Sequence, residues 1–72
     1  MIIDFINGSG NREIIINPTG FKADESLKGP VIEIDDGEIW SSTAFETCEE
    51  RDEAMNYISY HLKIGTKYLE LK

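Results

Sequence analysis

The chain has 72 residues, of which 14 are acidic and 7 basic, giving a formal net charge of −7. This balance argues against direct binding to DNA, RNA or an anionic membrane, because such binding needs a basic patch. Cys48 and His61 are the only cysteine and the only histidine, so neither a disulfide framework nor a zinc site can form within one chain. We therefore predict one small domain over residues 1–72, with no metal and no cofactor.

The amino-terminal stretch has neither the basic segment nor the long apolar run of a secretory signal. No segment approaches the ~18 apolar residues of a membrane-spanning helix. A lone free cysteine is typical of a reducing compartment. The expected location is therefore the cytoplasm.

Two strands are predicted at residues 1–6 and 12–17, joined by a glycine-rich hairpin loop at 7–11. A phosphate-binding loop would be followed by a helix rather than a strand, so we interpret this loop as a plain turn. Pairing Ile6 with Arg12 is favoured, since a slip of one residue would set Asp4 opposite Glu13. In this register Asp4 and Arg12 lie diagonally on one face, which predicts an ion pair.

Residues 18–30 are predicted to be a connection, because Pro18, Gly20, Gly29 and Pro30 punctuate them. We expect Phe21 and Leu27 to anchor this connection to the core. Residues 24–27 are compatible with one short helical turn.

A second hairpin is predicted from residues 31–34 and 39–43, because Asp36-Gly37 between apolar runs is a strong hairpin signal. A two-residue turn at Asp36-Gly37 and a four-residue loop both pair Ile34 with Ile39, which places Ile32, Ile34 and Ile39 on one face, under the helix. Val31, Glu33, Trp40 and Ser42 then share the opposite face. The four carboxylates around the turn lack the spacing of a calcium loop, so we interpret them as solvated. They are Glu33, Asp35, Asp36 and Glu38.

One helix is predicted between Thr47 and Gly65. Thr47 and Glu50 fit a capping box, and Gly65 stands where a left-handed residue ends a helix. One apolar stripe with spacings of three and four should face a sheet. Its members are Ala54, Met55, Ile58, His61 and Leu62.

An alternating last strand at 67–71 completes a β-β-β-β-α-β order. We expect an α+β fold, in which one amphipathic helix covers one face of an antiparallel or mixed sheet of about five strands.

No catalytic constellation is recognisable. Cys48 and His61 lie roughly 20 Å apart along the same helix, too far for a nucleophile–base pair. We expect Cys48 to be a packed residue and His61 to make a hydrogen bond at the edge of the core. The hydroxyl run Ser41-Ser42-Thr43 has no base at a fixed spacing. The protein is therefore predicted not to be an enzyme.

The favoured function is a protein-interaction module that binds itself or another protein through a sheet face. Its candidate surface is Trp40, Val31 and Glu33, and we predict a homodimer, or a tight complex with another protein, with Trp40 near the interface centre. The alternative for Trp40 is that loop residues such as Phe21 and Leu27 fold over its ring. The alternative is an acidic mimic of nucleic acid that inhibits a DNA- or RNA-binding protein. Its candidate surface is Glu49, Glu50 and Glu53, although ordinary acidic composition explains the same charge.

Overall fold

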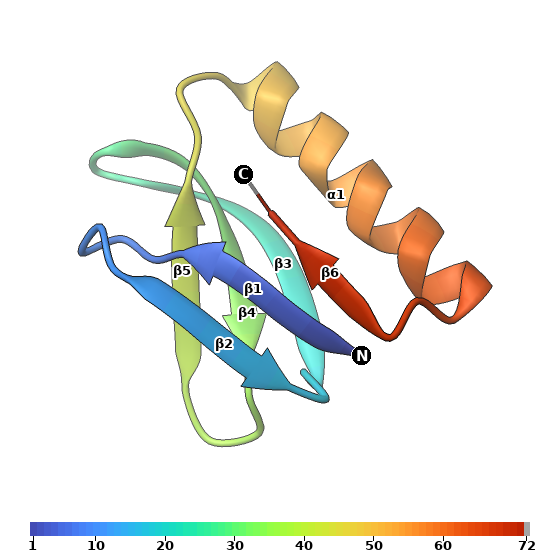
Figure 1. Cartoon of the computed structure of the whole chain (residues 1–72). Helices are drawn as coiled ribbons and strands as arrows, with labels where there is room; N and C mark the ends of the chain where they lie inside the picture. The colour runs from blue at the N-terminus through green and yellow to red at the C-terminus, as the bar shows by residue number, and fades with distance from the viewer. Residues whose placement is uncertain (72) are drawn as a thin grey trace.

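The computed structural model describes residues 1–71 (Figure 1). Over these residues the chain forms two three-stranded sheets, with strand orders β2-β1-β6 and β3-β4-β5, and one helix. The α+β class is confirmed, whereas the single sheet of about five strands is wrong. The elements are β1 (Ile2–Ile6), β2 (Arg12–Ile16), β3 (Gly20–Ser26), β4 (Gly29–Asp35), β5 (Trp40–Ala44), α1 (Cys48–Ile64) and β6 (Tyr68–Glu70).

The β1–β2 hairpin has the predicted register, with Ile6 opposite Arg12. Its loop is a turn, as expected, because the Asn7 side-chain oxygen accepts the backbone N–H groups of Ser9 and Asn11 at 3.0 and 3.1 Å. On the other side of β1, the last strand β6 runs parallel to it and sets Tyr68 beside Ile2.

Residues 20–26, predicted as a connection, instead form strand β3, which pairs along the whole of β4. Residues 24–26 are extended, and a two-residue turn at 27–28 joins β3 to β4, so the predicted helical turn is wrong. Gly29 supplies the positive φ of 121° that this turn requires. Phe21 packs against the core as expected, whereas Leu27 is fully exposed at the hairpin tip.

The β4–β5 hairpin is shifted by two residues from the predicted register, because Ile34 pairs with Ser41 rather than with Ile39. The Asp35 carboxylate accepts the Gly37 N–H at 2.8 Å, and Asp36 accepts the N–H of Ile39 at 3.0 Å. These bonds stabilise a four-residue loop at 36–39 in place of the tighter turn. Because side chains alternate between the two faces of a strand, a shift of two residues leaves each paired residue on its predicted face. Ile39, however, now lies in the loop and is exposed.

Helix α1 begins and ends as predicted. The Thr47 hydroxyl accepts the Glu50 N–H at 3.1 Å, and Gly65 adopts the left-handed conformation at φ 75°. Ile58 is buried, and Ala54 and Met55 pack against the core. Leu62 is half exposed, so the stripe is shorter than predicted. Within residues 1–71 no helix is long and apolar enough to cross a membrane.

The core lies between the inner faces of the two sheets and the buried side of α1. Figure 1 shows β1 and β2 crossing over β4 and β5, with α1 alongside β6. The inner side of the β2-β1-β6 sheet packs into the core, and among the described residues no helix or strand covers its other face. The buried core residues are Ile3, Phe5, Ile15, Ile32, Ile34, Ile58, Leu69 and Leu71.

Candidate functional site

The outer face of the β2-β1-β6 sheet carries a grid of side chains from three strands. Strand pairing places Ile2 between Ile16 and Tyr68, and Asp4 between Ile14 and Glu70. Ile6 lies opposite Arg12 at the end of the grid. We call this set of side chains the outer face.

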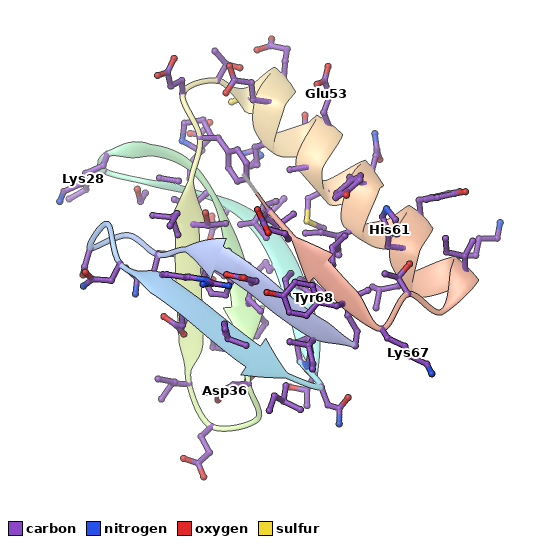
Figure 2. All side chains as sticks on the ribbon, viewed as in Figure 1. Lys28, Asp36, Glu53, His61, Lys67 and Tyr68 are labelled. Carbon is purple, nitrogen blue, oxygen red and sulfur yellow. The ribbon has the colours of Figure 1, made fainter. Side chains whose placement is uncertain are left out.

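A buried carboxylate occupies the centre of the outer face. Arg12 Nε donates to Asp4 Oδ1 at 2.9 Å and to Oδ2 at 3.1 Å, and its terminal nitrogen Nη2 forms a further ion-pair contact with Oδ2. The Tyr68 hydroxyl, labelled in Figure 2, also donates to Asp4, and Arg12 Nη2 donates to the Tyr68 oxygen at 3.3 Å. The ion pair predicted from the hairpin register is confirmed. Because Tyr68 belongs to β6, its bond to Asp4 connects the third strand of the sheet to this pair.

These contacts fix the protonation state of Asp4. Hydrogen bonds from Arg12 and then from Tyr68 lower the pKa of the Asp4 carboxyl to about 2. The bond to Asp4 raises the pKa of the Tyr68 hydroxyl. At neutral pH Asp4 is therefore an ionised acceptor whose Arg12 and Tyr68 donors are already in place. This arrangement orients side chains and is poorly suited to proton transfer.

Three isoleucines flank this polar centre and face solvent, and so does the ring of Tyr68. Ile6, Ile14 and Ile16 expose 51%, 50% and 68% of their surface, and Tyr68 exposes 47%. Strand pairing places all four on the same face of one sheet. Several exposed apolar side chains gathered on one sheet face around a polar centre are typical of a protein-binding site.

The three predicted interaction residues lie elsewhere, on the outer side of the β3-β4-β5 sheet. Trp40 is 51% exposed, and its ring edge lies over Gly20. Glu33 is partly buried, and Val31 is buried and therefore offers little area to a partner. Whether Trp40 contacts another molecule stays a prediction.

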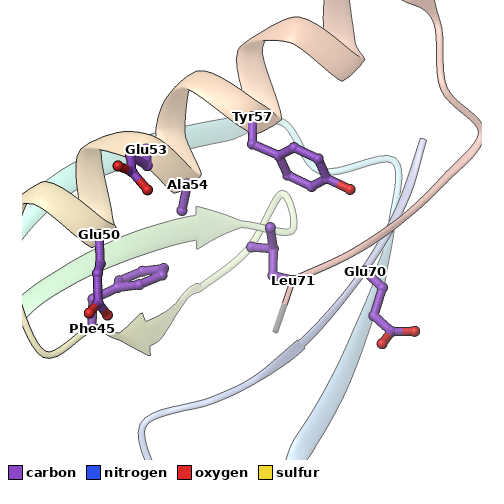
Figure 3. Close-up of a pocket in the computed structure, with 7 residues that line it drawn as sticks. All are labelled: Phe45, Glu50, Glu53, Ala54, Tyr57, Glu70 and Leu71. Atoms are coloured by element: carbon purple, nitrogen blue, oxygen red, sulfur yellow. The ribbon is translucent and has the colours of Figure 1, made fainter.

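Two of the three predicted acidic residues line a groove between α1 and the end of β6 (Figure 3). Glu50 and Glu53 stand at this groove with Glu70, whereas Glu49 does not line it. The groove has a volume of about 580 Å³. Its remaining lining is Phe45, Ala54, Tyr57 and Leu71.

His61 and Cys48, the two other candidates for chemistry in the sequence, each have a structural partner. His61 Nδ1 lies 2.6 Å from the Thr66 hydroxyl oxygen, which agrees with the expected hydrogen bond at the edge of the core. The Cys48 thiol donates to Glu25 at 3.4 Å, and this contact together with burial raises its pKa, away from a reactive thiolate. Among the described residues no group of three or more His, Cys, Asp or Glu side chains is arranged to hold a metal ion.

The sequence pointed to two members of the polar centre and missed the third. The hairpin register alone brings Asp4 and Arg12 together, whereas Tyr68 arrives through a parallel pairing that spans 64 residues. The alternating pattern of residues 67–71 indicated a strand, but not its neighbour or direction.

Comparison with known proteins gives no match: no family model, no curated protein and no solved structure matches this chain.

Proposed function

We propose that this protein is a non-enzymatic interaction module that binds a protein partner through the outer face of the β2-β1-β6 sheet. The observation that carries the proposal is the exposure of Ile6, Ile14, Ile16 and Tyr68 on one face. Burying this apolar area against a partner is favourable at about 25 cal/mol per Å².

The polar centre supports the same proposal. Aromatic and arginine side chains are the commonest energetic centres of protein interfaces. Here Tyr68 and Arg12 are held by the Asp4 carboxylate before any partner arrives. A surface whose side chains are already ordered loses less conformational entropy on binding.

Affinity purification with matched serine variants tests the proposal. Ile6→Ser removes an exposed side chain from the outer face, and Ile64→Ser removes one of similar exposure from the end of α1. We expect a partner captured by the parent chain to be lost with Ile6→Ser and retained with Ile64→Ser. Equal capture by both variants would contradict the proposal.

The second candidate function is inhibition of a basic nucleic-acid-binding protein, with the α1 groove as the contact surface. The observation that favours it is the grouping of Glu50, Glu53 and Glu70 around a partly apolar groove. Within residues 1–71 none of these three carboxylates forms a salt bridge.

This candidate predicts competition with DNA or RNA and a strong loss of affinity as salt increases. Glu50→Lys and Glu53→Lys should each weaken such binding more than Glu49→Lys, because Glu49 lies outside the groove. Binding that is insensitive to salt would exclude mimicry.

A further inference from the structure

Strand β2 is an open edge of its sheet (Figure 1). The bonds from Asn7 N to Asn11 O and from Asn17 N to Met1 O set the alternation of the β1–β2 ladder. The odd-numbered residues of β2 therefore bond to β1, and the amides of Arg12, Ile14 and Ile16 point away from it. Among residues 1–71 these three amides have no partner in the structure.

Strand β3, the longest edge strand of the other sheet, is protected in a way that β2 is not. On β3, Arg51 Nη1 donates to the Asp24 carbonyl at 3.0 Å, and the outward side chains include charged Lys22 and Asp24. Charges and covering contacts of this kind are how natural sheets prevent edge pairing. Strand β2 instead ends in three consecutive isoleucines.

A hollow of about 390 Å³ runs along the β2 edge. Glu13 and the isoleucines at 14, 15 and 16 form one wall, and Asp36 and Glu38 of the β4–β5 loop form the other. Bonds from the backbone N–H groups of Ile39 and Glu38 lower the pKa of Asp36, so this wall is anionic at neutral pH. A strand added to β2 would have one side against aliphatic side chains and the other against carboxylates.

We propose that the β2 edge binds an extended segment of a basic partner protein, which adds a strand to the β2-β1-β6 sheet. The segment alternates apolar residues, placed beside Ile14 and Ile16, with lysine or arginine, placed toward Asp36 and Glu38. This inference deepens the proposed function, because it names the chemistry of the partner that binds at this sheet.

Charge opposes a second copy of the chain at this edge. A copy centred on Ile15 would set only isoleucines of 14–16 opposite one another, so the net charge of the two chains is the obstacle in that register. An antiparallel copy of β2 centred on Ile14 would place its own Glu13 opposite Ile15, on the side of Asp36 and Glu38. A copy centred on Glu13 would set two glutamates opposite each other, which is destabilising. The net charge of −7 also opposes association between copies and favours a basic partner.

The test uses as the probe a six-residue peptide of alternating lysine and valine, with a fluorophore on its amino terminus and an amidated carboxyl terminus. Its binding to the full chain is measured by fluorescence anisotropy at several salt concentrations. We expect binding that weakens with salt, and no binding of the matched peptide in which glutamate replaces lysine. A third peptide, N-methylated at alternate residues, keeps the charge but cannot complete the ladder, and it should not bind.

Protein variants locate the peptide. Ile14→Pro removes one outward amide at an edge position that tolerates proline, and it should weaken binding by at least about tenfold, whereas Ile14→Ala keeps the amide and should have a smaller effect. Asp36→Asn with Glu38→Gln should weaken binding and its salt dependence. The control variant, Glu46→Gln with Glu49→Gln, makes the same change in charge on exposed acids outside the hollow, and it should leave peptide binding unchanged.

Equal binding of the N-methylated peptide, no binding of any peptide, or no effect of the Asp36 and Glu38 changes would overturn the inference. Concentration-dependent dimers that Ile14→Pro abolishes would show a second copy at this edge and would also overturn it. If the peptide fails to bind while Ile6→Ser still abolishes capture of a partner, the edge inference fails and the proposed function stands. If the peptide binds at β2 while capture of a partner is insensitive to Ile6→Ser, the edge inference stands and binding through the outer face fails.

Discussion

The Arg12 guanidinium holds the Asp4 carboxylate at two points, with Nε 2.9 Å from Oδ1 and 3.1 Å from Oδ2. The two residues are diagonal neighbours across the β1–β2 pair, since Asp4 lies opposite Ile14 and Arg12 opposite Ile6. Tyr68 extends the contact to β6. All three strands of the sheet are therefore linked on the face that we propose binds a partner.

The Asp4 contact predicts a pH-dependent stability difference between the parent chain and Asp4→Asn. The pKa of Asp4 is about 2 in the folded state, below its ordinary value of 3.8. The stabilisation is therefore complete above pH 3.8 and is lost as the pH falls toward 2. Urea unfolding should show the parent to be more stable at pH 6, with a difference that shrinks toward pH 2. A constant difference would contradict the predicted linkage.

Ile58→Ala should lower the free energy of unfolding by about 2–5 kcal/mol, because it leaves a cavity where α1 packs on the core. Leu62→Ala is the matched control on the same helix, and half-exposed Leu62 should contribute within about 0.5 kcal/mol. Denaturant unfolding measures both variants. Equal effects would mean that α1 does not pack through Ile58.

Thr47→Ala should destabilise the protein by about 1 kcal/mol, the usual contribution of an amino-terminal cap. The Thr47 hydroxyl accepts the Glu50 N–H at 3.1 Å, and alanine cannot accept it. Thr47→Ser retains the acceptor and should unfold at nearly the parental denaturant concentration. If serine and alanine destabilise equally, the cap bond contributes nothing.

The sequence predicted elements whose signals are local. Asp4 and Glu13 fixed the β1–β2 register by the like-charge pair that a slip would create, and Thr47 and Gly65 marked the helix ends. The sequence pattern did not indicate strand β3, because Lys22, Asp24 and Glu25 make it polar and because prolines and glycines flank it. Strand β3 is held in place by backbone pairing with the apolar strand β4, and not by an apolar pattern of its own.

The remaining errors come from interactions between distant segments or from alternative side-chain bonds. The division into two sheets depends on β6 joining β1, a parallel pairing that no local pattern specifies. The β4–β5 register depends on whether Asp36 accepts loop amides or leaves a tighter turn to form. For the candidate surface, a single sheet would have one face away from the helix, and that face would carry Trp40. The division into two sheets adds the exposed outer face of the β2-β1-β6 sheet.

Trp40 fluorescence distinguishes the two sheet faces. Because Trp40 is about half exposed and on the other sheet, its emission should stay unchanged when a partner binds the outer face. If the homodimer predicted from the sequence forms around Trp40, emission should shift to the blue with concentration, and Trp40→Ala should weaken association by about 2 kcal/mol or more. Fluorescence recorded alongside analytical ultracentrifugation separates these outcomes.

Isoleucine methyl NMR tests the proposed binding face most directly. Ile6, Ile14 and Ile16 report on the outer face of the β2-β1-β6 sheet, while Ile64 at the end of α1 is similarly exposed outside it. On titration with a captured partner, we predict that the methyl signals of Ile6, Ile14 and Ile16 shift while that of Ile64 does not. A shift of Ile64 without shifts of Ile6, Ile14 and Ile16 would show that the partner binds another surface and would contradict the proposed function.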